Sequence, residues 1–321
     1  MRRSRPGLRG AAIAGGTGLK VLSRPVALAL LVVLALVWGV HWAVVKIGLG
    51  YMPPLSYAAL RLFLGLVTVV IVLGARGGLR LPPRSDLPIV LSVAFGQVAS
   101  GILIINFVIL TVGAGRSSVL QFTMPLWVAA LQLAVFRIRL ARNEAIGLLL
   151  GIVGLVALFN PAVVDWTRPG EVVGMVALLV NAVMWAGVTI HIRRHTWASS
   201  PFVLQPWQLL AAFLPVAVAA FAVEGFQGID WQPQTVLVLL YSGPLATGFG
   251  FWASQVVTRA LGPQAGGTGF LAVPVVGLTS GALLLGEAIG PLDIVAFVLL
   301  LAGVGIASLW PSRAARIAGA A

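Results

Sequence analysis

The chain has 321 residues, of which 60% are apolar and only 9% are charged, and its mean hydropathy is +1.04. A soluble globular domain needs many more charged residues to cover its surface, so this composition excludes that class and indicates an integral membrane protein. The net charge of +13 does not indicate nucleic-acid binding, because the basic residues are spread over the amino-terminal tail and the short connections between apolar runs.

Residues 1–24 precede the first apolar run and carry six basic residues among Gly, Ala and Ser. This composition predicts a short, disordered cytoplasmic tail. A cleaved signal peptide is disfavoured, because the apolar run that follows is long enough to span a membrane and the chain then continues to cross it.

Long apolar runs bounded by Pro, Gly or charge predict membrane helices, which need about 20 apolar residues, rather than barrel strands, which alternate in polarity over about 10. The predicted spans cover residues 26–46, 55–74, 87–111, 116–136, 143–160, 171–192, 202–223, 235–258, 265–286 and 291–310. Because the connections between them are short, the sequence predicts an all-α membrane protein of ten transmembrane helices with no inserted soluble domain.

The distribution of charge predicts the orientation, because Lys and Arg collect in cytoplasmic loops. With the amino terminus inside, 17 of the 21 basic residues fall in inner segments and Arg61 lies within a span. The three outer basic residues are Lys46, Arg116 and Arg168. Six acidic residues lie in the outer segments: Asp165, Glu171, Glu224, Asp230, Glu287 and Asp293. The sequence therefore predicts a multi-pass protein of the cell membrane with both termini in the cytoplasm.

The sequence also contains an internal repeat. Pro125 in the fourth span and Pro274 in the ninth are 149 residues apart. The same offset pairs Gly101 with Gly250, Asn106 with Gln255, Gly113 with Gly262 and Gly154 with Gly303, while an offset of 147 pairs Trp38 with Trp185, Lys46 with Arg193 and Pro54 with Pro201. The chain thus divides into five-helix halves, a first half at 25–160 and a second half at 170–310, followed by a cytoplasmic tail at 311–321. Because five is odd, the second half enters the membrane from the opposite side, and inverted repeats are typical of secondary transporters.

Four motifs carry a family resemblance. They are VWGVHWAVVK in the first span, PPLSYAALR at the start of the second, VPVVGLTSGALLLGEAI in the ninth and LLLAGVGIA in the tenth. In this order, over roughly residues 25–310, the chain resembles the EamA-type bacterial exporters of the drug/metabolite transporter superfamily. The resemblance implies export of amino acids or metabolites, with a multidrug or nucleotide-sugar carrier as the alternative. The second half ends its ninth helix with the Gly286-Glu287 pair usual in the family, whereas the first half has Arg137-Ile138.

Polar side chains within a membrane are costly unless they face the interior of the helix bundle or a water-filled cavity. The predicted substrate-binding residues of a central cavity are Trp38, His41, Trp42, Gln97, Gln121, Asn181, Trp185, Thr247 and Gln255. The alternative for each polar residue is a hydrogen bond between helices. Pro125 and Pro274 are predicted points of helix flexing, with a packing kink as their alternative.

His41 lies between two tryptophans, and Trp38 is about 12 Å deeper than Lys46 by helical rise. That depth is too great for the aromatic belt at the lipid headgroups. Two indoles beside an imidazole suit an amphipathic organic solute, so we expect His41 to line the cavity. Histidine also titrates near neutral pH, which leaves proton coupling open, and a hydrogen bond to a neighbouring helix is the third reading.

Arg61 is the one basic residue well inside a span, about 10 Å from the helix start at Pro54. Three roles are open: contact with a substrate carboxylate through its fork of donors, capping of free backbone carbonyls, or extension to the outer surface. Its counterpart in the repeat is Gln208, so the charge is not part of the symmetric scaffold.

Other function classes are disfavoured. An intramembrane enzyme needs clustered nucleophiles, acids or metal ligands, whereas this chain has no Cys, three His and eight acidic residues. His191 and His195 have metal-ligand spacing, but the two arginines between them would repel a cation. No charged filter indicates a channel, and no P-loop indicates an ATP-driven pump. We therefore expect no catalytic site, metal or cofactor, and expect a small-molecule solute and membrane lipid as partners, with the oligomeric state open.

Overall fold

A computed structural model describes residues 23–135, 137, 140–160, 164 and 166–309. The predicted amino-terminal tail lies outside these residues except for its last two, and the predicted tail at 311–321 lies wholly outside them. Within the described residues every regular element is a helix, which confirms the all-helical expectation.

The helices of the first half follow the predicted apolar runs. They are α1 (Arg24–Gly48), α2 (Pro54–Ala75), η1 (Arg84–Asp86), α3 (Leu87–Val93), η2 (Ala94–Ala99), α4 (Ser100–Val112), α5 (Ala114–Gln121), α6 (Met124–Ala134) and α7 (Arg142–Leu158). The helices of the second half are α8 (Pro169–Arg194), α9 (Pro201–Glu224), α10 (Pro233–Leu240), η3 (Tyr241–Phe249), α11 (Gly250–Gly269), α12 (Ala272–Leu285) and α13 (Pro291–Leu309).

By length and composition, seven helical stretches of the described chain suffice to cross a membrane. They are Arg24–Gly48, Pro54–Ala75, Arg84–Val112, Ala114–Ala134, Pro169–Ile192, Pro201–Glu224 and Pro233–Val257. Ala272–Leu285 and Pro291–Ile306 are shorter apolar helices, and α7 has 17 residues. The protein is therefore a multi-pass membrane protein.

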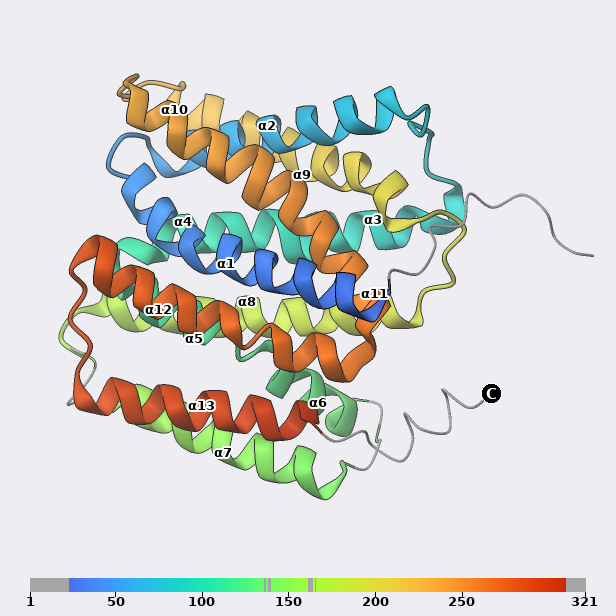
Figure 1. Cartoon of the computed structure of the whole chain (residues 1–321). Helices are drawn as coiled ribbons and strands as arrows, with labels where there is room; N and C mark the ends of the chain where they lie inside the picture. The colour runs from blue at the N-terminus through green and yellow to red at the C-terminus, as the bar shows by residue number, and fades with distance from the viewer. Residues whose placement is uncertain (1–22, 136, 138–139, 161–163, 165, 310–321) are drawn as a thin grey trace, which may run out of the picture.

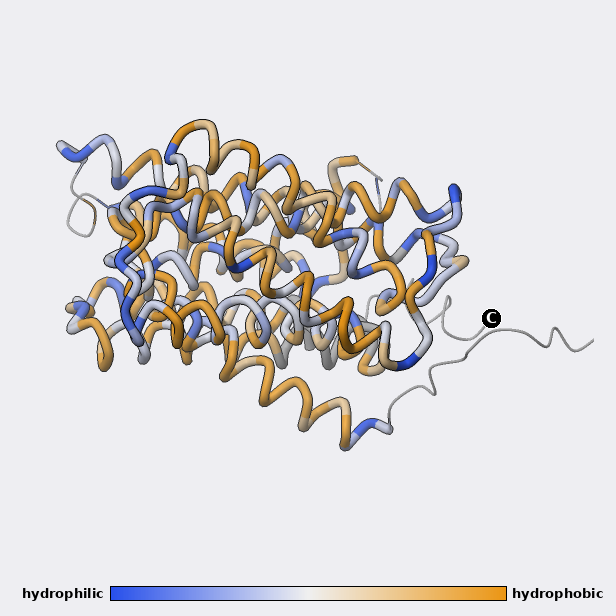
Figure 2. Tube along the Cα trace, turned by 90° about the horizontal axis from the view of Figure 1, so that it is seen from above, coloured by the Kyte–Doolittle hydropathy of each residue, from blue (hydrophilic) through white to orange (hydrophobic). Residues whose placement is uncertain are grey.

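The helices lie side by side in one bundle, and the start of α1 and the end of α13 are at the same end of it (Figure 1). Hydrophilic residues gather at the two ends of the bundle, while the stretches between them are mostly hydrophobic (Figure 2). Large apolar side chains face outward along the helices, such as Val32, Val218 and Leu283, which are 60%, 67% and 84% exposed. Such a surface suits lipid, because hydrocarbon tails solvate apolar side chains without cost.

Three hydrophobic clusters form most of the core. One packs α2, α3 and α9 around Leu62, Ile89 and Leu209. The second joins α4, α8 and α13, with Leu178 and Leu300 fully buried or nearly so. The third lies between α1, α2, α4 and α10 near the connection from α1 to α2. Since each cluster contains residues of both halves, the two halves form one packed unit.

The fourth predicted span is two helices rather than one. A turn at Phe122–Thr123 separates α5 from α6, and Pro125 lies in the first turn of α6. The second half has an equivalent turn at residues 270–271, followed by Pro274 in the first turn of α12. In a first turn the backbone N–H groups have no intrahelical acceptor, so proline starts a helix there without losing a hydrogen bond. α11 also continues to Gly269, through the connection expected between the eighth and ninth spans.

Two π-helices interrupt the third and eighth predicted spans. They are η2 in the first half and η3 in the second, and the repeat offset of 149 residues places them at equivalent positions. π-Helical turns are rare and occur frequently at functional sites. They therefore mark where the central site should be sought.

Candidate functional site

Each π-helix accepts a hydrogen bond from a tryptophan of the other half. Trp38 Nε1 donates to the carbonyl oxygen of Ala246 in η3 at 2.9 Å, and Trp185 Nε1 donates to that of Gln97 in η2 at 3.1 Å. The two tryptophans are equivalent in the repeat, and so are the two carbonyls. The same contact therefore joins the halves twice, in opposite directions.

Two repeat-related glycines make room for these indoles. A Cβ at Gly250 would overlap Nε1 of Trp38, and one at Gly101 would lie 3.2 Å from Nε1 of Trp185. Real Cβ atoms rarely approach a neighbour so closely. The glycine pair seen in the sequence thus has a physical reason in the packing of the opposite half.

The central aromatic cluster contains Trp38, Trp185, Phe251 and Phe270. The ring centroid of Trp38 lies 6.3 Å from that of Trp185, 5.7 Å from that of Phe251 and 6.2 Å from that of Phe270. Trp42 is not in this cluster, because it packs into the third core cluster near the end of α1. The structure therefore separates the two tryptophans that flank His41 in the sequence.

His41 is buried at 9% exposure and its ring stacks on Tyr241, with the centroids 6.1 Å apart and the planes 10° from parallel. The Tyr241 hydroxyl donates to the Val37 carbonyl oxygen at 2.9 Å, which fixes this ring. His41 Nε2 has no hydrogen-bond partner among the described residues. The imidazole thus keeps one nitrogen available to a further group.

Gln121 and Asn181 meet between α5 and α8. Asn181 Nδ2 donates to Gln121 Oε1 at 2.7 Å, while Gln121 Nε2 and Asn181 Oδ1 have no partner among the described residues. This contact is the helix-to-helix hydrogen bond that was the alternative to cavity lining. Gln97 and Gln255 are also buried, at 8% and 9% exposure.

Arg61 lies against Thr247 of η3. Its Nε and Nη2 donate to the same oxygen, Thr247 Oγ1, at 3.3 and 3.2 Å. Thr247 in turn donates its hydroxyl hydrogen to the Ser242 carbonyl oxygen at 2.7 Å. The structure therefore brings two of the predicted site residues from different halves into contact.

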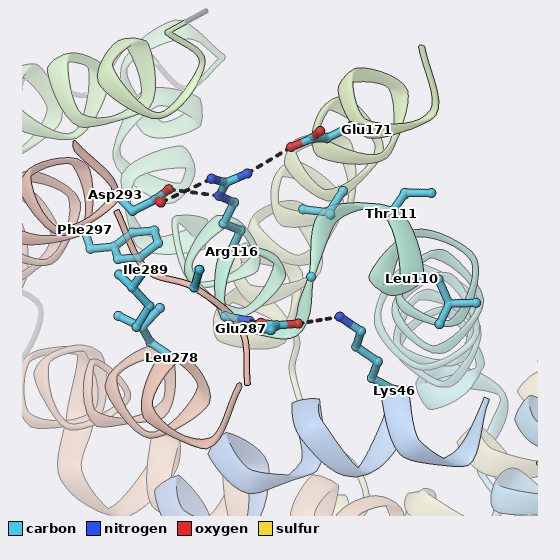
Figure 3. Close-up of a pocket in the computed structure, with 14 residues that line it drawn as sticks. Lys46, Leu110, Thr111, Arg116, Glu171, Leu278, Glu287, Ile289, Asp293 and Phe297 are labelled. Atoms are coloured by element: carbon cyan, nitrogen blue, oxygen red, sulfur yellow. Dashed lines mark hydrogen bonds and ion pairs between the residues drawn. The ribbon is translucent and has the colours of Figure 1, made fainter. Parts of the chain in front are cut away.

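A pocket of about 240 Å³ lies at the end of the bundle where α1 ends and α13 begins (Figure 3). Lys46 Nζ pairs with Glu287 Oε1 at 2.6 Å. Arg116 pairs with Glu171 and with Asp293, at 2.9 Å each. These ion pairs join the two halves across the pocket. They were not predicted as site residues, although the gathering of opposite charges in the predicted outer segments was a signal for them.

Glu287 also caps the start of α5. Its carboxylate accepts the backbone N–H of Ala114 at 2.7 Å and that of Gly115 at 3.0 Å. Gly113, just before this helix, has φ of +87°, which favours glycine. Burial by itself raises the pKa of Glu287, but the Gly115 N–H, Lys46 and the Ala114 N–H together hold the pKa below its usual value.

The two histidines with metal-ligand spacing have other partners. His195 Nε2 lies 2.9 Å from Asp86 Oδ1, and His191 Nδ1 lies 2.9 Å from Ser92 Oγ. Asp86 also accepts the backbone N–H groups of Ala198 and Ser199, at 3.1 and 2.8 Å. These residues join the halves at the end of the bundle opposite the pocket.

Comparisons with known proteins agree with this architecture. The profile of the EamA-like transporter family matches residues 25–160 and again residues 172–309. A Salmonella typhimurium protein named "Probable amino-acid metabolite efflux pump" is 32% identical over 310 residues, covering 91% of this chain and 98% of the relative. An Escherichia coli protein of the same name is 30% identical over 292 residues, covering 87% and 93%.

A protein crystal structure superposes with a TM-score of 0.63 at 21% identity, covering 89% of this chain and 97% of that one, and therefore has the same fold. The two family matches cover most of the chain, and the relatives are similar over nearly their full length. The chain belongs to the EamA-like transporter family and is a membrane transporter rather than an enzyme.

Proposed function

We propose that the protein is a secondary active transporter that exports small amphipathic metabolites, such as amino acids, by alternating access. The observation that carries the proposal is the reciprocal contact of Trp38 and Trp185 with the two π-helices. It means that the halves pack on each other in equivalent ways, which is the architecture that lets a carrier rock between two similar states. The names of the two relatives support efflux of amino-acid metabolites. A multidrug or nucleotide-sugar carrier is the alternative.

The proposal includes ten transmembrane spans as two inverted five-helix halves, with the start of α1 and the end of α13 facing the cytoplasm. The placement of both at one end of the bundle supports an even number of crossings (Figure 1). The excess of basic residues in the corresponding connections supports the cytoplasmic assignment of that end.

In this orientation the ion pairs of the pocket close the outer end of the carrier. The repeat offset of 149 residues matches Glu287 with Ile138 and Arg116 with Ala265, so these two charges have no charged counterpart in the sequence of the other half. At the inner end the halves are joined by other contacts, such as that of Asp86 with His195. Because the ion pairs of the pocket join the halves at the outer end, we take the structure to represent a state that is closed toward the outside.

The solute path is proposed to run through the centre, between the aromatic cluster and the buried polar residues. Flat apolar walls with a few polar groups suit an amphipathic solute. The side-chain atoms of His41, Gln121 and Asn181 that have no partner among the described residues are the polar groups that would orient it. His41 is also the residue that would carry a coupling proton, if transport uses one.

An efflux panel in living cells tests the proposal. Cells expressing the protein should tolerate higher concentrations of one or more amino acids or analogues than vector controls, and should release the labelled compound faster. The panel also includes hydrophobic drugs and nucleotide sugars to test the alternative. Equal tolerance and equal release for every compound, with the protein present in the membrane, would contradict export.

Topology fusions test the ten-span arrangement independently. Reporters placed after residues 80, 140 and 315 should report a cytoplasmic location, and those after residues 50 and 165 an external one. An external reading after residue 315 would rule out the ten-span model, because it requires an odd number of crossings.

A further inference from the structure

Arg61 is a buried cation that has no anionic partner among the described residues. Arg61 is 4% exposed. It lies about 10 Å along α2 from the start of this helix at Pro54. A guanidinium carries five N–H donors. Among the described residues, two of them share the single oxygen of Thr247 at 3.2 and 3.3 Å, and this is the only hydrogen-bond partner of the group.

Two structural roles for this arginine do not fit the contacts. Capping of free carbonyls requires a backbone oxygen as acceptor, and within the described chain Arg61 donates to none. Extension to the outer surface requires an exposed head group, whereas Arg61 is buried. Neither of these structural roles therefore explains why a positive charge is buried at this position.

Three acidic residues near the outer end of the bundle, where α2 begins, are engaged elsewhere. Glu287 pairs with Lys46, and Asp293 pairs with Arg116. Glu224 accepts the N–H of Ser56 at the start of α2. A buried charge is strongly destabilising unless an opposite charge or several hydrogen bonds compensate it. The missing compensation points to an anion that is not part of the chain.

Neighbouring amides supply further uncommitted polar atoms. α2 packs against both α9 and η3, and α9 carries Gln208, the repeat counterpart of Arg61. Gln208 is 1% exposed, its Nε2 has no partner among the described residues, and its Oε1 accepts Gln255 Nε2 at 3.5 Å. Gln205 Oε1 is likewise without a partner there.

From this geometry we propose that Arg61, positioned by Thr247, receives a carboxylate of the transported solute. The guanidinium group presents a planar fork of N–H donors that matches the two oxygens of a carboxylate. The point charge of a lysine and the neutral amide of a glutamine do not offer this match. The inference rests on the proposed transport function and narrows its substrates to solutes that carry a carboxylate. The amide of the same solute should be a poor substrate.

Competition with matched acid and amide pairs tests the assignment. The protein is reconstituted in lipid vesicles, and each amino acid of the panel and its amide compete against the labelled exported solute. In the wild type the acid should compete roughly tenfold to hundredfold better than the amide, as expected for loss of a charge-assisted hydrogen bond. Arg61→Gln should weaken competition by the acid to the level of the amide, and Arg61→Lys should retain part of the preference.

Arg76→Gln is the matched control, because it removes a guanidinium from the exposed end of the same helix and should keep the wild-type preference. If Arg61→Gln does not fold, Thr247→Val removes the positioning oxygen alone and should weaken the acid but not the amide. A folded Arg61→Gln or Thr247→Val protein that still prefers the acid as the wild type does would overturn the assignment. Equal competition by acid and amide in the wild type would also overturn it while leaving transport intact, whereas no export by the wild type would contradict the proposed function itself.

Discussion

Trp38 and Trp185 are equivalent residues of the two halves, and each donates its indole N–H to the π-helix of the other half. The acceptors, Ala246 and Gln97, are equivalent as well. Each half thus holds the irregular helix of its partner by a side chain and receives the same support in return. In a carrier that rocks between two states, these contacts lie where the halves turn against each other.

Replacing the indoles tests this contact. Trp38→Phe and Trp185→Phe keep an aromatic ring but remove the indole hydrogen bond to a buried carbonyl, which costs about 1 kcal/mol or more each. Both variants should melt at lower temperature in detergent and should transport more slowly than the wild type. The two losses should be similar in size because the contacts are equivalent.

Trp127→Phe provides the control for these substitutions. Trp127 donates to Thr123, four residues away on the same chain segment, at 3.1 Å, so loss of this hydrogen bond leaves both indole contacts between the halves in place. Its transport rate should stay near that of the wild type. A large loss of transport in Trp127→Phe, or unchanged transport in Trp38→Phe and Trp185→Phe, would contradict a special role of the paired tryptophans.

The pair of Lys46 and Glu287 is expected to hold the outer end closed. Ser118 is fully buried one turn beyond the capped start of α5, and the chain has no native cysteine, so Ser118→Cys reports opening. Adding Glu287→Gln should raise the labelling rate by an impermeant thiol reagent from outside roughly tenfold, because a charge-assisted contact is lost.

Glu144→Gln is the control for this measurement. Glu144 accepts the Ala141 N–H at 2.7 Å at the start of α7, at the opposite end of the bundle. Adding Glu144→Gln should leave the labelling rate of the Ser118→Cys protein unchanged. Equal labelling with and without Glu287→Gln would show that the ion pair does not close the outer end.

The lowered pKa of Glu287 predicts how the closure depends on pH. A carboxyl whose pKa is lower in the folded protein contributes stability above its unfolded-state pKa, and loses it as the pH falls through the folded-state value. The difference in melting temperature between the wild type and Glu287→Gln should therefore be constant from pH 8 to about 5, and shrink only below about 4. A difference that disappears near pH 6 would contradict the assignment of the carboxylate.

His41 is predicted to orient the solute through Nε2, which has no hydrogen-bond partner in the described part of the chain. His41→Ala should leave the protein folded and reduce apparent affinity roughly tenfold to hundredfold. If His41 instead carries the coupling proton, His41→Gln should bind solute normally but lose the pH dependence of uphill transport. A lowered melting temperature with normal transport indicates a structural role, and normal behaviour of both variants would exclude His41 from the site.

Helix positions were predictable because the backbone N–H and C=O groups of a segment in lipid need hydrogen-bond partners within the protein, and few structures other than a helix provide them. The second span, expected at 55–74, is Pro54–Ala75, and the seventh, expected at 202–223, is Pro201–Glu224. The π-helices were not predictable, since the stretch 94–99 carries no local signal for one. They accept hydrogen bonds from tryptophans far away in the chain, and single-sequence patterns do not encode such contacts.

The contacts within the candidate site could not be predicted from the sequence for the same reason. Arg61 and Thr247 were each singled out as polar residues within apolar runs, but their contact spans 186 residues of sequence. Lys46 and Glu287 are 241 residues apart, and the sequence did not predict that they form a pair. Residue type and depth are properties of the sequence, whereas partnership between distant residues depends on how the two halves pack.

Counterflow in reconstituted vesicles tests the central claim most directly. Vesicles containing the purified protein are loaded with an unlabelled amino acid identified by the panel and diluted into a trace of the labelled form. An alternating-access carrier should accumulate the label transiently above its outside concentration, and protein-free vesicles should not. Simple equilibration of the label, or no uptake beyond that of protein-free vesicles, would contradict the account.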